Sequence, residues 1–191
     1  MYPRNNDPRA GKNNLDSIEG EVSARVVDHE IRPGGLIFAL TEAKMHLIKI
    51  RPPAGKPLLE AGTILDITSK GGSGQILGTL NYRNLTSAGQ NNLAGIIESI
   101  ISENAEPFIS FFNRAGNLSL KMHAFQLLPG IGKKKALEIV DLRGRNGWDD
   151  FATMDSSCGI DGKNLLAQRL AQEISDQHEQ PRLVDLLLRQ E

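Results

Sequence analysis

Short runs of hydrophobic residues, several of them alternating with polar ones, fill the chain between about residue 20 and residue 82. Gly, Pro and Asp separate these runs, a pattern that is typical of short strands joined by turns. Five such runs predict a small β-barrel over residues 20–82, of the OB type or a similar one. The predicted strands are Val22–Val27, Leu36–Leu40, Met45–Ile50, Thr63–Ile67 and Gln75–Leu80.

A helical period replaces this pattern after Tyr82. Thr86 can cap a helix whose apolar positions follow at spacings of three and four residues. A second helix, Glu106–Asn113, carries three phenylalanines whose spacing places them on one helical face. Aromatic side chains can stack on bases, but this spacing favours core packing. Residues 83–116 are therefore predicted to be linking helices, with Leu93, Ile96, Ile97, Ile100 and Ile101 buried in the first and Phe108, Phe111 and Phe112 in the second.

The segment Asn117–Arg145 has the sequence form of a helix-hairpin-helix. We predict a first helix at Leu118–Leu127, a tight turn at Pro129-Gly130-Ile131-Gly132, and a second helix from about Lys133. Glycines permit backbone conformations that a Cβ forbids, and Ile131 is expected to anchor the turn from inside. The N–H groups at the start of the second helix then face outward at the positive end of its dipole. Such an arrangement is a phosphate-binding site.

Basic residues gather around this hairpin. Six of them stand against two acidic residues between Lys121 and Arg145, whereas four stand against nine from Asn146 to the end. Cations beside a phosphate site add affinity that does not depend on base identity. An ordinary αα-hairpin or a protein-interaction module is the alternative. The predicted nucleic-acid-binding residues are Pro129, Gly130, Ile131, Gly132, Lys133, Lys134, Lys135, Lys121, Arg143 and Arg145.

A second, degenerate copy of the hairpin is predicted to follow, so that residues 117–191 form a tandem domain. Trp148–Met154 suggests a short helix, Cys158-Gly159-Ile160-Asp161 a turn, and Gly162–Ser175 a further helix. Asp161 occupies the position that Gly132 has in the first copy, and a carboxylate there would repel phosphate. The second hairpin is therefore expected to pack against the first rather than to bind. Leu183–Leu188 is predicted to form a closing helix.

Composition sets limits on other functions. Hydrophobic content is 39% and charged content 24%, as in a globular protein. Because the net charge is only −1, evidence for a polyanion partner must come from local charge. The single cysteine, Cys158, and four scattered histidines offer no metal site, and no catalytic constellation or cofactor motif is recognisable. The absence of a signal sequence or membrane span predicts a cytoplasmic protein. Residues 1–19 are polar and are predicted to be a disordered arm.

The stretches Leu80–Asn113 and His123–Val140 resemble an archaeal family catalogued as a domain of unknown function. Its members are described as putative RNA- or DNA-binding proteins, with an OB-like N-terminal domain followed by a helix-hairpin-helix pair. The resemblance extends over about Glu21–Arg189. It implies that Leu128–Lys135 is the binding loop and Tyr82–Thr86 the linker.

The sequence therefore predicts an α+β protein of more than one domain, a small OB-like β-barrel followed by an all-α helix-hairpin-helix domain. The expected function is non-enzymatic nucleic-acid binding, with RNA preferred over DNA on the resemblance alone. One alternative is a protein-interaction adaptor in a ribosomal or transcription assembly, which the acidic C-terminal portion would suit. A second alternative is a DNA repair or nucleic-acid processing factor.

Overall fold

The computed structural model describes residues 15–32 and 34–188, and the chain divides into two compact units between Asn81 and Tyr82. Most of the arm predicted at residues 1–19 lies outside the described residues. Its last part differs from the prediction, because a short 3-10 helix, η1 (Asp16–Ile18), precedes the sheet. Ile18 is buried in the core of the first unit, so the folded part begins before residue 20.

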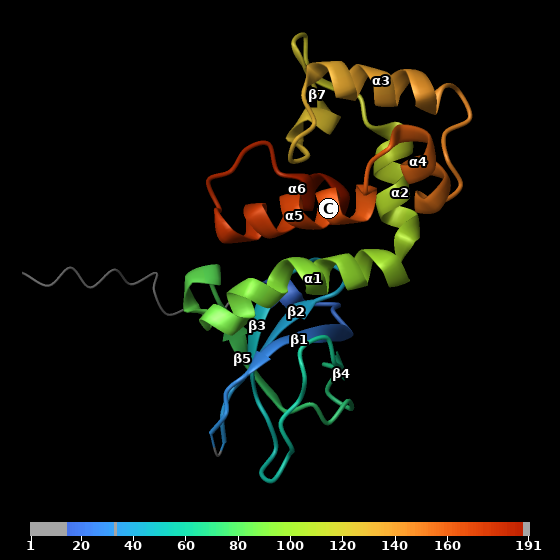
Figure 1. Cartoon of the computed structure of the whole chain (residues 1–191). Helices are drawn as coiled ribbons and strands as arrows, with labels where there is room; N and C mark the ends of the chain where they lie inside the picture. The colour runs from blue at the N-terminus through green and yellow to red at the C-terminus, as the bar shows by residue number, and fades with distance from the viewer. Residues whose placement is uncertain (1–14, 33, 189–191) are drawn as a thin grey trace, which may run out of the picture. The chain divides into compact units, whose positions relative to one another are not determined.

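The described residues of the first unit form a five-stranded antiparallel sheet (Figure 1). All five predicted strands are present close to their expected positions. They are β1 (Ser23–His29), β2 (Ile37–Thr41), β3 (Leu47–Arg51), β4 (Ile64–Asp66) and β5 (Gln75–Thr79).

The strand order of this sheet is β4-β1-β2-β3-β5, which leaves β4 and β5 at its edges. No ladder joins these two edge strands in the described residues, so the sheet is open where a closed barrel was expected. The physical reason lies in β4, which has only three residues, about 10 Å of strand, and so offers β5 few backbone groups on its outer edge. The confirmed part of the fold prediction is thus a mixed α+β chain with a five-stranded antiparallel sheet.

One face of the sheet holds the core of the first unit. Ala24 and Val26 on β1 lie two residues apart, as do Ile48 and Ile50 on β3, so their side chains point to the same side. Ile18 before the sheet and Leu65 on β4 complete this core. The period of two therefore places these core residues on one face, while residues of the opposite face, such as Val27 and Leu40, are buried as well.

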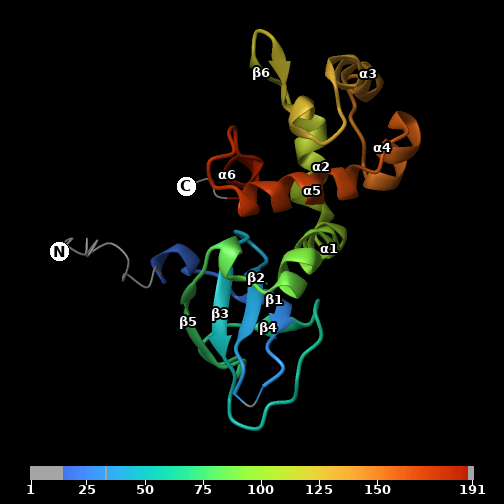
Figure 2. The same cartoon turned by 60° about the vertical axis from the view of Figure 1, so that its left-hand side comes forward.

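The second unit is mainly helical (Figures 1 and 2). Thr86 caps its first long helix as predicted, since Thr86 Oγ1 accepts a hydrogen bond from the Gly89 amide at 3.0 Å. Helix α1 packs along α5. The elements are η2 (Tyr82–Asn84), α1 (Ser87–Glu103), α2 (Ala105–Arg114), β6 (Asn117–Ser119), β7 (Met122–His123), η3 (Ala124–Leu127), α3 (Lys133–Arg143), α4 (Phe151–Cys158), α5 (Gly162–Ser175) and α6 (Leu183–Leu188).

The three phenylalanines of α2 are core residues, as their spacing predicted. Phe112 is fully buried, and its ring stacks on Phe125 with 5.7 Å between ring centroids. Phe151 meets Phe112 edge to face at the same centroid distance. These contacts join α2 to η3 and to α4. The rings of Phe108, Phe111 and Phe112 are thus used in packing rather than exposed for base stacking.

The predicted helix at Leu118–Leu127 is wrong. A two-stranded hairpin, β6–β7, occupies its first part, and η3 follows directly. The segment Asn117–His123 alternates polar and apolar residues, a period of two that favours strands over helices. The second unit is therefore not all-α.

The second hairpin matches its prediction more closely. Helix α4 begins at Phe151, three residues after the expected start, and Gly159 ends it in the left-handed conformation with a φ of 62°. Helices α5 and α6 have the predicted bounds.

Candidate nucleic-acid interface

The first turn has the backbone form that its sequence predicted. Gly130 has a φ of 74°, which a residue with a side chain rarely adopts. The Ile131 amide donates to the carbonyl oxygen of Leu128 at 3.1 Å and closes the turn. The side chain of Ile131 is buried while Gly130 and Gly132 are exposed. The buried side chain of Ile131 thus fixes the turn to the core, and the exposed backbone of the two glycines faces solvent. Pro129 is half-buried beside them.

The N-terminus of α3 is open to a ligand. Gly132 is its N-cap residue, and among the described residues no side chain accepts a hydrogen bond at this cap. The first intrahelical bond runs from the Ala136 amide to the Gly132 carbonyl oxygen. By helix geometry, the amides of Lys133, Lys134 and Lys135 have no acceptor within α3. They point along the positive end of the helix dipole.

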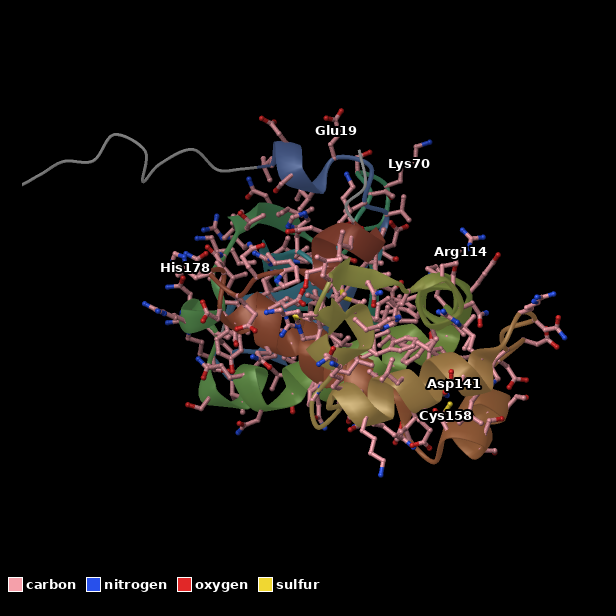
Figure 3. The ribbon with its side chains drawn as sticks, turned by 90° about the horizontal axis from the view of Figure 1, so that it is seen from above. Glu19, Lys70, Arg114, Asp141, Cys158 and His178 are labelled. Carbon is pink, nitrogen blue, oxygen red and sulfur yellow. The ribbon has the colours of Figure 1, made fainter. Side chains whose placement is uncertain are left out.

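The three lysines after the turn differ in their surroundings. Lys133 and Lys134 are exposed, and no ion pair involves either of them within residues 15–32 and 34–188. Lys135 is half-buried, and its Nζ pairs with Glu138 Oε1 at 2.8 Å. The same Nζ donates to the carbonyl oxygen of Cys158 at 2.5 Å. Lys135 therefore joins α3 to the end of α4, where Figure 3 labels Cys158.

The remaining predicted cations also divide into exposed and engaged groups. Lys121 is exposed at the tip of the β6–β7 hairpin, and Arg145 is exposed after α3. Arg143 is half-buried; its Nη1 donates to the carbonyl oxygens of Phe112 at 3.2 Å and Ala115 at 2.7 Å. Its guanidinium also lies 5.8 Å from the Phe125 ring centroid. Arg143 thus closes the C-terminal end of α2.

The second turn is built on the same plan but carries carboxylates. Asp161 is the N-cap residue of α5, as Gly132 is of α3, and its Oδ1 accepts from the Asn164 amide at 3.1 Å. Asp155 on α4 reaches the same helix end, where its Oδ1 accepts from the Gly162 amide at 2.7 Å. Two amides that could face a phosphate in α5 are therefore bonded to the protein's own carboxylates.

The electrostatics of this second helix end oppose an anionic ligand. Burial raises the pKa of Asp155, and the nearby charge of Asp161 raises it further, while the Gly162 amide and Lys163 act in the opposite direction. Lys163 is half-buried and lies 5.9 Å from the Phe151 ring centroid. A phosphate would meet two acidic side chains there.

His123 and Cys158 have structural positions in this unit. His123 Nδ1 accepts from the Phe125 amide at 3.1 Å and caps η3, while Gln126 Oε1 accepts from the His123 amide at 3.0 Å. Burial, followed by the charge of Arg143, lowers the pKa of His123. Burial raises the pKa of the Cys158 thiol, which favours its neutral form.

Arg114, Leu118 and Leu120 are surface residues of this unit that the sequence pattern did not single out. Arg114 ends α2 and is exposed (Figure 3). Leu118 and Leu120 belong to the hairpin that was expected to be a helix, and they are 39% and 104% exposed. The alternation of residues 117–123 was the signal that could have identified them.

Among residues 15–32 and 34–188, no group of three or more His, Cys, Asp and Glu side chains could hold a metal ion. None of the described helices has both the length and the apolar composition that a membrane-spanning helix requires.

Comparison with known proteins gives one family. The model of the family described as "Protein of unknown function (DUF655)" matches residues 15–183. Uncharacterized protein MJ0038 of Methanocaldococcus jannaschii is 25% identical over 97 residues, which are 51% of this chain and 45% of that protein. The chain thus spans less than half the length of this curated relative. The crystal structure of Af1531 from Archaeoglobus fulgidus, 26% identical, superposes with a TM-score of 0.77 over 86% of this chain and 99% of that one. The chain belongs to the DUF655 family of proteins of unknown function.

Proposed function

We propose that this protein binds nucleic acid without acting on it chemically, and that it grips the sugar-phosphate backbone at the N-terminus of α3. The observation that carries the proposal is the contrast between two equivalent helix ends. Gly132 leaves the first one uncapped beside exposed Lys133 and Lys134, whereas Asp155 and Asp161 bond to the amides of the second. Of the two ends, the first has the chemistry that an oxyanion requires.

Local charge supports the same site. From Pro107 to Leu137 the sequence contains no Asp or Glu, and its positive charges include Arg114 and Lys121 as well as the lysine run. A segment with cations and no carboxylates attracts a polyanion even in a chain of net charge −1. Because main-chain amides and lysines recognise phosphate, the binding is proposed to be tolerant of base sequence.

The strand order of unit 1 supports a related proposal for the first domain. Strands in the spatial order 4-1-2-3 form a Greek key, and β5 extends it beside β3. An open five-stranded Greek-key sheet of this kind is compatible with an OB-like barrel, a fold that binds oligonucleotides in many proteins. We accordingly propose an OB-like domain followed by paired helix-hairpin-helix elements, the first of which has the 3-10 helix η3 in place of its first α-helix. The preference for RNA over DNA rests on the family resemblance alone.

The test is equilibrium binding of the full chain to labelled short RNA and DNA over a series of salt concentrations. Lys121, Lys133 and Lys134 are exposed, so about three phosphates should be neutralised, and log K should fall against log salt with a slope of about −2 to −3. Lys133→Glu should weaken binding at least tenfold (about 1.4 kcal/mol). Lys163→Glu, the matched change in the second hairpin, should leave it nearly unchanged.

The outcomes separate the proposal from its main alternative. Absence of binding at low salt would contradict the proposal. Co-purification with ribosomal or transcription proteins that survives nuclease treatment would then support the adaptor function. Equal losses from Lys133→Glu and Lys163→Glu would show that both hairpins bind, and the assignment of the site to the first hairpin would be wrong.

A further inference from the structure

The β6–β7 hairpin carries an exposed apolar side chain at its tip. Leu120 is 104% exposed, which is full exposure, and it lies between Ser119 and Lys121. Figure 2 shows the tip of this hairpin projecting beyond the helices of the second unit. Ser119 Oγ accepts a hydrogen bond from the Lys121 amide at 3.3 Å, which restrains the turn. A fully exposed leucine on a restrained turn gains nothing for folding, since it buries no surface.

The neighbouring leucine has a packing role that Leu120 lacks. Leu118 lines an apolar groove of about 450 Å³ together with Phe111 and Leu183, and Leu120 lies outside that groove. A single projecting side chain is also far smaller than the surface that a stable protein–protein contact buries. Leu120 is therefore better suited to entering a narrow space than to forming a docking surface.

Charge identifies the kind of ligand that such a side chain would enter. Arg114 at the base of the hairpin and Lys121 at its tip are exposed cations, and the acid-free segment 107–137 contains them both. Exposed cations of this kind bind a phosphate backbone. In several nucleic-acid-binding proteins, apolar side chains such as leucine insert as wedges between stacked bases.

We propose that Leu120 inserts between bases of the bound nucleic acid, with Lys121 against an adjacent phosphate, so that the protein prefers a site that is already unstacked. This inference rests on the proposed function of the α3 N-terminus and adds the class of substrate, a duplex interrupted by an unpaired nucleotide. Opening a stacked step costs free energy, and an interrupted duplex has already incurred that cost.

The experiment compares two short RNA duplexes that differ by one bulged nucleotide, each with a fluorescent 2-aminopurine at the same step. The full chain should bind the bulged duplex about tenfold more tightly and raise the 2-aminopurine emission there, because insertion keeps that base unstacked. Leu120→Ala should abolish the preference and the rise in emission, while salt-dependent binding through the lysines persists. Ile64→Ala, which truncates a 55% exposed side chain on β4, is the control and should change neither measurement.

The results distinguish failure of insertion from failure of binding. Salt-dependent binding of both duplexes with equal affinity, or a preference that Leu120→Ala retains, would overturn the insertion and leave the phosphate site intact. Failure of the unmodified chain to bind either duplex at low salt would overturn the phosphate site and the insertion together. Replacing Lys133 and Lys134 by Glu should weaken binding to both duplexes equally, since these residues act on the backbone.

Discussion

Lys135 Nζ donates a hydrogen bond to the main-chain carbonyl oxygen of Cys158 at 2.5 Å, at the C-terminal end of α4. A lysine at a helix C-terminus stabilises the orphan carbonyls and the negative end of the dipole. Glu138 holds the same ammonium group from α3. Of the three consecutive lysines, the third thus connects α3 to α4, while Lys133 and Lys134 stay exposed.

This difference between Lys135 and the other two lysines predicts that substitutions at neighbouring positions affect either stability or nucleic-acid binding. Lys135→Met should lower the free energy of unfolding by about 1 kcal/mol, since it removes a charged, part-buried hydrogen bond to the carbonyl oxygen of Cys158. Reversing Lys133 and Lys134 to Glu should leave stability nearly unchanged and weaken nucleic-acid binding at least tenfold. Thermal unfolding and binding titrations of the same preparations measure the two effects. A larger loss of affinity from Lys135→Met than from the double reversal would contradict these separate roles of Lys135 and of Lys133 and Lys134.

The cap position of α3 offers a change that separates binding from folding. Gly132 has a φ of −81°, and no atom lies within 4 Å of where its Cβ would be, so Asp fits without strain. Gly132→Asp should cap α3 as Asp161 caps α5, and should raise stability by a few tenths of a kcal/mol. It should nevertheless weaken binding by about tenfold, because the carboxylate occupies the amides and repels phosphate.

Gly132→Ser is the matched neutral control for this substitution, since serine caps the helix without adding charge. It should weaken binding less than Gly132→Asp does. Calorimetry confirms that each variant is folded, and titration with nucleic acid gives the affinities. Unchanged affinity in the folded aspartate variant would place the phosphate elsewhere.

Arg143 is predicted to act on stability rather than on binding. Its guanidinium bonds to the carbonyl oxygens of Phe112 and Ala115, so Arg143→Ala leaves the C-terminal end of α2 without these donors. We expect a loss of about 2 kcal/mol in the free energy of unfolding. Arg145→Ala, two residues away and exposed, should change stability by less than about 0.5 kcal/mol. Urea unfolding of both variants tests this, and equal stabilities would show that the α2 end needs no such donor.

The lowered pKa of His123 predicts acid sensitivity. Because the folded-state pKa is lowered, folding favours the neutral imidazole of His123. Its contribution to the free energy of unfolding is fully present above the ordinary pKa of 6.5. That contribution is lost as the pH falls through the folded-state pKa. His123→Asn keeps a side chain that can cap η3 but does not titrate. As the pH falls below 6.5, the unmodified protein should therefore lose stability relative to the variant. If the free energies of unfolding of the two proteins fall in parallel below pH 6.5, His123 is not the source of the acid sensitivity.

Much of the fold followed from local patterns. Thr86 and the spacing of the isoleucines defined α1, and the glycine turn placed the start of α3, because caps and turns depend on a few neighbouring residues. The prediction failed at Leu118–Leu127, where apolar residues were taken as helical despite their alternation. Closure of the barrel was a further failure, since whether β4 meets β5 depends on contacts between strands distant in sequence.

The sequence by itself determined that the two turns correspond, with Gly132 and Asp161 at matching cap positions, because each turn is set by residues adjacent in the chain. Only the tertiary structure decided which cations are engaged. Lys135 meets the carbonyl of Cys158, 23 residues away, and Arg143 meets that of Ala115, 28 residues away. These carbonyl partners are brought close by the packing of helices that are distant in sequence. Cations of one short segment therefore differ, because some bond to the protein itself and others stay exposed.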